Sequence, residues 1–296
     1  MTAAYRAEHL IDAREARRRA AGLAFLEVAP WKAMAEGPDP ITGSIPGAFP
    51  TAITSDFAGV PTETSGHLPL PERATLQRRI AGLGIGPHDE IVVYTRRIEE
   101  LSSATRAWFT LTWAGYTAVR VLDGGLPAWV AAGGATGPPG TPGAPARDVP
   151  PANGREGGGL RVLGVAEVLD ISRYGTLLDA RPASAYDGAR DDPRSGHVPH
   201  AVHAPWTALV AGDGRLLPPT ELRRWLLARR AIGGHDVGAY CGGGVGSSVL
   251  VFAGALLGQE IGLYVDSWSA WRRDESLPVE QGASLTRSEA VDADCA

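Results

Sequence analysis

Cysteine is scarce in this chain of 296 residues, which contains only Cys241 and Cys295. Two thiols cannot build a disulfide scaffold, and alone they make no zinc site. Cys295 is the penultimate residue of a polar tail, where a reactive side chain would have no fixed surroundings. Any functional role for cysteine is therefore expected at Cys241.

Long apolar runs and strong net charge are also missing. No stretch approaches the roughly 18 apolar residues that cross a bilayer, and arginines interrupt the first residues, where a secretory signal would need an apolar core. The net charge is -5 and the pI is about 5.8, which gives no global attraction to nucleic acid or to anionic membranes. We expect a cytoplasmic protein with no nucleic-acid partner and no membrane partner.

One segment in the middle of the chain lacks large apolar residues. Residues 137–159 read GPPGTPGAPARDVPPANGREGGG, a composition that cannot bury enough surface to fold by itself. We predict a linker there, between a first domain at 1–136 and a second domain at 160–282, followed by a polar tail at 283–296. Two domains also suit the length, at about 150 residues per domain.

The two halves repeat four short segments in the same order. Residues 25–28, 43–48, 91–94 and 123–129 match residues 177–180, 196–201, 237–240 and 265–271. In each half an apolar run, a helical pattern and a second apolar run follow one another: 91–94, 103–114 and 118–122, then 237–240, 247–257 and 261–265. Strand, helix and strand in this order predict an α/β fold, a small parallel sheet with helices on both faces in each domain.

A glycine-rich loop follows the strand predicted at 237–240 and opens the next helix. It reads Cys241, Gly242, Gly243, Gly244, Val245, Gly246, Ser247. Ligands bind at this end of parallel strands, and glycines let the backbone N–H groups turn inward. Those groups and the helix N-terminus stabilise a thiolate, so Cys241 is a candidate nucleophile. A buried core cysteine is the alternative; a phosphate-binding P-loop would need a Lys-Ser/Thr pair that is missing.

From about residue 5 to 282 the chain resembles the tandem-domain rhodanese and 3-mercaptopyruvate sulfurtransferase family. The resemblance rests on the Cys241 loop and on three further motifs: Asp179-Ala180-Arg181, Gly196-His197-Val198-Pro199 and Ser267-Trp268-Ser269-Ala270-Trp271. It implies two rhodanese-like domains, of which only the second is catalytic, since Thr95 stands in the place of Cys241 and Ala29 in that of Arg181.

The resemblance also implies an activity. A sulfane sulfur would move from thiosulfate or 3-mercaptopyruvate to a thiol, cyanide or protein acceptor, through a persulfide on Cys241 and with no metal or organic cofactor. Arg181 is the candidate for gripping an anionic donor, because guanidinium binds carboxylate in a two-bonded fork. Arg190, in the following acidic loop, is a second candidate.

Departures from the family loop leave two alternatives. Mercaptopyruvate-type members carry Cys-Gly-Ser-Gly-Val-Thr, whereas here Gly243 replaces the serine and Gly246 the threonine. Asp56 and His67 are the apparent counterparts of residues proposed to form a relay with that serine. A sulfur-relay or binding protein with low turnover is therefore the alternative. A related phosphatase is disfavoured, because Ser247 stands where that class needs arginine.

Overall fold

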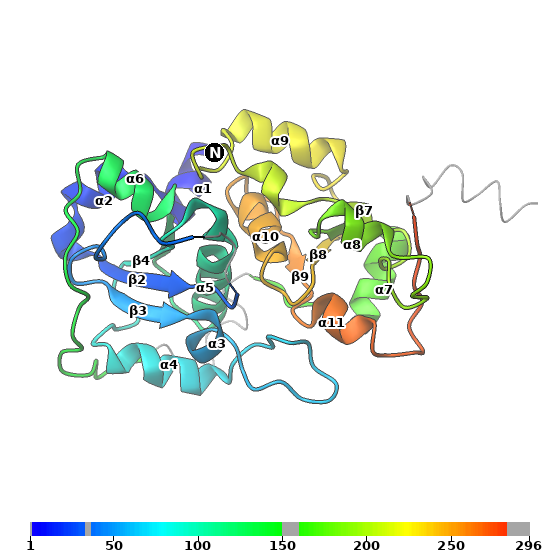
Figure 1. Cartoon of the computed structure of the whole chain (residues 1–296), viewed down its shortest axis with the longest axis horizontal. Coiled ribbons are helices and arrows are strands. Elements are labelled where there is room, and N and C mark those ends of the chain that lie inside the picture. The colour runs from blue at the N-terminus through cyan, green and yellow to red at the C-terminus, as the bar shows by residue number, and fades with distance from the viewer. Residues whose placement is uncertain (1, 33–36, 150–159, 283–296) are drawn as a thin grey trace, which may run out of the picture.

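The computed structural model describes residues 2–32, 37–149 and 160–282 (Figure 1). Cys295, the predicted tail and the second part of the predicted linker lie outside the described residues. Two sheets of entirely parallel strands, one in each half, form the frame of the fold. The α/β fold predicted from the sequence is confirmed.

The first half contains a five-stranded sheet of order β1-β5-β4-β2-β3. Its elements are α1 (Thr2–His9), β1 (Leu10–Ile11), α2 (Ala13–Arg18), η1 (Ala20–Gly22), β2 (Ala24–Ala29), β3 (Phe49–Ala52), α3 (Ile53–Asp56), α4 (Arg73–Gly82), β4 (Ile91–Tyr94), η2 (Ile98–Glu100), α5 (Leu101–Trp113), β5 (Val119–Leu122) and α6 (Gly125–Ala131). Side chains alternate between the faces along each strand. On β4, Val93 packs with α3, α4 and α5, while Val92 packs with α2 and α6.

The second half contains a four-stranded sheet of order β7-β6-β8-β9. Its elements are α7 (Val165–Tyr174), β6 (Thr176–Asp179), α8 (Ala183–Asp187), β7 (Val202–His203), η4 (Trp206–Leu209), α9 (Pro219–Ala228), β8 (Val237–Tyr240), α10 (Ser247–Ala255), β9 (Gly262–Leu263) and α11 (Ser267–Trp271). On β8, Ala239 packs with α9 and α10, and Tyr240 packs with α7 and α11. Helices thus cover both faces here too.

The internal repeat extends to backbone conformation. Gly125 and Ser267 occupy equivalent positions after their strands, and both have positive φ, +57° and +54°. The next amide donates to the equivalent carbonyl in each half, Leu126 to Thr95 at 2.9 Å and Trp268 to Cys241 at 3.0 Å. Strand β9 is shorter than predicted, because the chain turns away after Leu263 to enter this bend.

The halves share one core. Helix α5 of the first half packs along α10 of the second, visible side by side in Figure 1. The rings of Trp108 and Phe252 meet edge to face at 4.8 Å, and the Thr105 and Ser248 hydroxyls are 2.8 Å apart. Residues 137–149 run back along the first half, where Gly137 pairs with Ser44. No helix in the described ranges is both long and apolar enough to cross a membrane.

Candidate active site

Cys241 lies where β8 ends at the carboxyl edge of the second sheet, and its side chain is buried. Its Sγ accepts the backbone N–H of Gly244 at 3.1 Å. Gly244 can present this N–H because it has φ of +78°, a conformation that glycine adopts without strain. A Cβ there would also lie 2.4 Å from the Val265 carbonyl oxygen. The loop thus turns the N–H group of Gly244 toward the sulfur.

The start of α11 holds the loop in place. The Ser267 hydroxyl accepts the Cys241 N–H at 3.2 Å and donates to the Tyr264 carbonyl at 2.8 Å. The Trp268 and Ser269 amides then donate to the carbonyls of Cys241 and Gly242. All five residues of the Ser267–Trp271 helix are small or aromatic and all are buried, which explains why this motif accompanies the cysteine loop.

A segment of the first half also contacts the start of α11 beside the cysteine loop. The Gly66 amide donates to Asp266 Oδ1 at 2.8 Å, and the His67 amide donates to Ser269 Oγ at 3.0 Å. Gly66 must be glycine, because a Cβ would lie 2.3 Å from the Asp266 carbonyl oxygen. The His67 side chain is exposed beside Gly243, with its Cβ 3.8 Å from the position of a Cβ on that glycine. The structure thus brings His67 to the loop.

Asp56 has other partners. Its Oδ1 accepts Arg79 Nε at 2.5 Å, and its Oδ2 accepts the Ala52 amide and the Ser55 hydroxyl. It lines a cavity of about 570 Å³ that residues 54–79 of the first half enclose. No hydrogen bond joins Asp56 to His67 within the described residues. The relay inferred from the family pattern stays a prediction, and its aspartate is paired with Arg79.

Arg181 is buried and forms an ion pair with Asp179. Its Nε and Nη2 donate to the Asp179 carboxylate, and Nη2 also donates to the Gly196 carbonyl at 2.6 Å. The guanidinium lies 4.4 Å from the centre of the Trp268 ring. Burial opposes its charge, but the bonds to Asp179 leave the pKa of Arg181 raised. These contacts join the end of β6 to the Gly196 turn; donor binding by Arg181 stays a prediction.

The acidic loop after α8 contributes two different arginines. Arg194 donates to the carbonyls of Trp271, Arg272, Asp274 and Leu277, so its guanidinium braces the segment after α11. Arg190 is exposed, and no described residue forms an ion pair with it. Of the two, Arg190 has the guanidinium that is open to an incoming anion.

The glycines that depart from the family loop have unequal surroundings. At Gly243 a Cβ would meet nothing nearer than His67 at 3.8 Å. At Gly246 a Cβ would lie 2.8 Å from Cδ1 and 3.0 Å from Nε1 of Trp206, and 3.7 Å from the Cβ of Cys241. The edge of the Trp206 indole therefore occupies the space beside the cysteine where a threonine side chain would stand. Ser247, which follows, is buried, and its hydroxyl has no hydrogen-bond partner among the residues that the structure describes.

Arg106 is the site residue that sequence reasoning missed. It lies on α5 of the first half, is completely buried, and donates through Nη1 to the Gly244 carbonyl at 3.1 Å. The available signal was that Arg106 is the one charged residue of the α5 helix, since a buried guanidinium requires partners.

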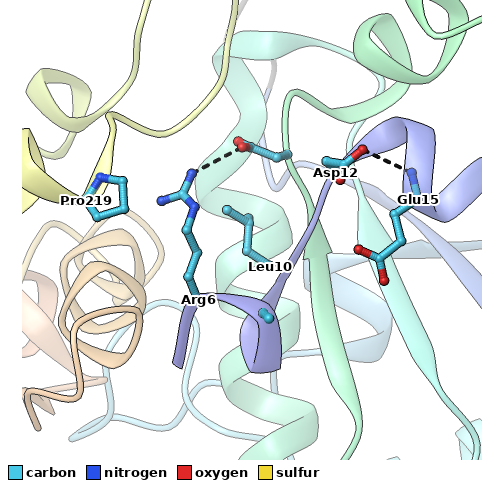
Figure 2. Close-up of a pocket in the computed structure, with 7 residues that line it drawn as sticks. Arg6, Leu10, Asp12, Glu15 and Pro219 are labelled. Atoms are coloured by element: carbon cyan, nitrogen blue, oxygen red, sulfur yellow. Dashed lines mark hydrogen bonds and ion pairs between the residues drawn. The ribbon is translucent and has the colours of Figure 1, made fainter. Parts of the chain in front are cut away.

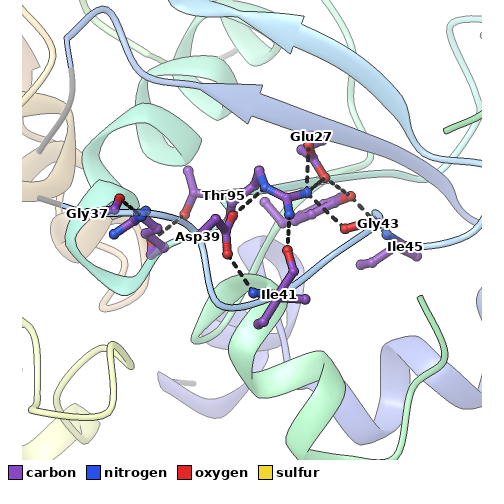
Figure 3. Close-up of polar contacts among 10 residues, drawn as sticks. Glu27, Gly37, Asp39, Ile41, Gly43, Ile45 and Thr95 are labelled. Carbon is purple, nitrogen blue, oxygen red and sulfur yellow. Dashed lines mark hydrogen bonds and ion pairs between the residues drawn. The ribbon is translucent and has the colours of Figure 1, made fainter. Parts of the chain in front are cut away.

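The equivalent loop of the first half is closed by its own side chains (Figure 3). Thr95 stands in the place of Cys241, and its hydroxyl donates to the Arg97 carbonyl at 3.1 Å. Arg96 pairs with Asp39 and Glu27 and donates to the Ile41 and Gly43 carbonyls. Glu27 is the counterpart of Asp179, so in this half a loop arginine takes the role that Arg181 has in the other.

A cavity between the halves is lined by no residue of the cysteine loop (Figure 2). It measures about 470 Å³ and is lined by Arg6, Asp123 and Pro219 among others. Arg6 pairs with Asp123 at 3.4 Å, and Asp123 also accepts the Leu216 amide. Across the described ranges, no three His, Cys, Asp or Glu side chains gather closely enough to hold a metal.

The Rhodanese-like domain family matches residues 2–132 and 165–274 of the chain. SseB of Mycobacterium tuberculosis, named as a thiosulfate sulfurtransferase, is 34% identical over 82% of the chain and 85% of the relative. A protein of Pseudomonas aeruginosa named as a 3-mercaptopyruvate sulfurtransferase is 34% identical over 80% and 84%. The 3-mercaptopyruvate sulfurtransferase of Escherichia coli is 31% identical over 79% and 83%.

Among solved structures, wild-type EanB superposes with a TM-score of 0.75 over 93% of the chain and 70% of EanB, at 19% identity, which shows the fold alone. The family match and the relatives together define the class: the chain belongs to the tandem rhodanese-like sulfurtransferases. It is an enzyme that transfers sulfur, as the resemblance implied.

Proposed function

We propose that Cys241 carries the transferred sulfur. The observation that supports this most directly is the bond from the Gly244 amide to its Sγ, in a loop at the carboxyl edge of the sheet. A preorganised N–H donor stabilises charge that develops on the sulfur, as an oxyanion hole does for oxygen. The first half offers no equivalent, because Thr95 has no thiol to form a persulfide.

The proposed reaction has two steps. The Cys241 thiolate attacks the outer sulfur of the donor and forms a sulfur–sulfur bond. With thiosulfate, the donor's own sulfur–sulfur bond breaks and its electron pair leaves on sulfite. With 3-mercaptopyruvate, the carbon–sulfur bond breaks and the pair stays on carbon, which takes up a proton to give pyruvate. A thiol, cyanide or protein thiolate then removes the outer sulfur and restores the Cys241 thiolate, in a ping-pong sequence.

Among donors, we propose that 3-mercaptopyruvate suits this loop better than thiosulfate. None of the residues from Gly242 to Ser247 is cationic, so the loop offers little compensation for a dianion. A single carboxylate could instead meet Arg190, whose side chain is exposed in the loop after α8. Of the relatives, one is named for thiosulfate and another for 3-mercaptopyruvate, so their names do not decide between the donors.

A sulfur-relay role with low turnover is the second candidate. It is favoured by the indole edge of Trp206 in the place of a threonine, because the loop lacks both hydroxyls of the mercaptopyruvate-type pattern. For either role we propose a cytoplasmic location and no nucleic-acid or membrane partner, in keeping with the net charge of -5.

Both donors should be assayed side by side with cyanide as acceptor. The mass of the intact protein should also be measured by mass spectrometry after incubation with the donor and no acceptor. We expect turnover with both donors, a higher kcat/KM for 3-mercaptopyruvate, and the mass of one added sulfur that disappears in Cys241→Ser. A persulfide that forms within one turnover but passes slowly to cyanide would favour the relay role. Sulfur loading that persists in Cys241→Ser would refute the assignment.

A further inference from the structure

Arg106 carries a buried positive charge that no carboxylate of the described ranges binds directly. Its guanidinium donates to backbone carbonyls, at 3.1 Å to Gly244 and 2.9 Å to Leu68, with longer contacts of 3.5 Å to Phe57 and Pro69. Its Nε has no partner within the described residues. Burial lowers the pKa of Arg106 to about 10, so the cation persists at neutral pH. Burying such a charge is costly unless something nearby balances it.

The balancing groups lie in the other half of the molecule. Cys241 and Asp266 are the acidic groups that interact with Arg106 electrostatically. Asp266 already accepts the Gly66 amide through Oδ1. Cys241 is neutral as a thiol, but it becomes an anion as the attacking thiolate and again as the persulfide. The sulfur is therefore the charge near Arg106 that changes during the reaction.

Gly244 connects the two groups. Its N–H donates to Cys241 Sγ at 3.1 Å, and its carbonyl accepts from Arg106 Nη1 at 3.1 Å. A Cβ on Gly244 would lie 2.9 Å from that same Nη1, so the guanidinium fits directly against the glycine backbone. With its carbonyl held in this direction, Gly244 keeps the φ of +78° that turns its N–H toward the sulfur.

We propose that Arg106, from the half without a cysteine, is a positioning residue for sulfur transfer, which orients Gly244 and balances the negative charge of the Cys241 thiolate and persulfide. This rests on the proposed role of Cys241. It gives the first half, which has no cysteine, a part in the chemistry. Arg106 is completely buried, where a donor entering from solvent does not reach it, so its effect falls on the reactivity of the sulfur more than on donor binding.

Arg106→Lys and Arg106→Met test the proposal, with Arg120→Met as the matched control. Arg120 is also largely buried in the first half, but it lies on β5 and pairs with Glu90 and Glu15. We expect kcat to fall about tenfold or more in Arg106→Met, less in Arg106→Lys, with the donor KM changed less than about threefold. The control should keep its kcat.

Two further measurements separate this role from simple loss of structure. Alkylation of Cys241 by iodoacetamide at neutral pH should slow in the same order as kcat, and it needs no donor. Sulfur loading should raise the melting temperature of the wild type more than that of Arg106→Lys, a comparison made within each folded protein. If Arg106→Met fails to fold, the lysine variant decides.

The proposal would be overturned if Arg106→Lys and Arg106→Met both kept the kcat and the Cys241 alkylation rate of the wild type. A rise in KM alone would overturn it too, because that would make Arg106 a donor-binding residue. A wrong assignment of Cys241 would give a different result. The wild type itself would then load no sulfur on Cys241, whatever residue stands at position 106.

Discussion

Threonine at position 246, the residue of the mercaptopyruvate-type loop, should destabilise this protein, whereas serine at position 243 should not. The backbone of Gly246 is helical, with φ of -60°, so a side chain is not strained there by itself. The obstacle is Trp206, whose ring atoms would lie 2.8 and 3.0 Å from the new Cβ. Forcing atoms into such a packed position costs about 1–3 kcal/mol.

Urea denaturation of Gly246→Thr and Gly243→Ser should resolve this difference. At Gly243 the nearest atom to a new Cβ is 3.8 Å away, an ordinary contact, so its free energy of unfolding should change by less than about 0.5 kcal/mol. The double variant Trp206→Ala, Gly246→Thr should be more stable than the sum of the single changes, because truncation removes the clash. Equal stability of the two glycine variants, or strict additivity in the cycle, would refute the reasoning.

Three further changes test the site. Cys241→Ser should abolish sulfur transfer while Cys295→Ser retains it in the same donor assay; equal loss in both would contradict the assignment. Gly243→Ser should raise activity with 3-mercaptopyruvate more than with thiosulfate, and adding Asp56→Ala should cancel the gain if a relay exists. A gain that persists in the double variant would show that Asp56 takes no part in a relay. Arg181→Lys should lower the free energy of unfolding by about 1–3 kcal/mol through loss of the fork to Asp179, measured in urea; unchanged stability with a raised KM would show donor binding instead.

Sequence patterns were sufficient to predict the two parallel sheets, because each pattern follows from a constraint on neighbouring residues. Alternation on β4 and β8 and glycine at Gly244 each follow from a backbone or burial constraint, and the strands at Ile91–Tyr94 and Val237–Tyr240 begin and end where predicted. The repeat between the halves was readable for the same reason: equivalent turns impose equivalent residues.

The rest depends on contacts between distant segments. Trp206 and Gly246 are 40 positions apart, and no local pattern shows that an indole fills the space beside a glycine. Arg106 meets Gly244 only because α5 packs against α10. Arg181 lies on the predicted strand edge, but its neighbour Asp179 takes its donors, and sequence position alone does not reveal which way a guanidinium turns.

The core that runs from Trp108 to Phe252 has a consequence for how such a duplicated chain can evolve. The copy without a cysteine has a loop of different composition, and Arg96 of that loop forms ion pairs with Glu27 and Asp39. The copy could not be deleted, however, because removing α5 would expose the apolar flank of α10 to water. A half that carries no cysteine is thereby an obligatory part of its neighbour's interior.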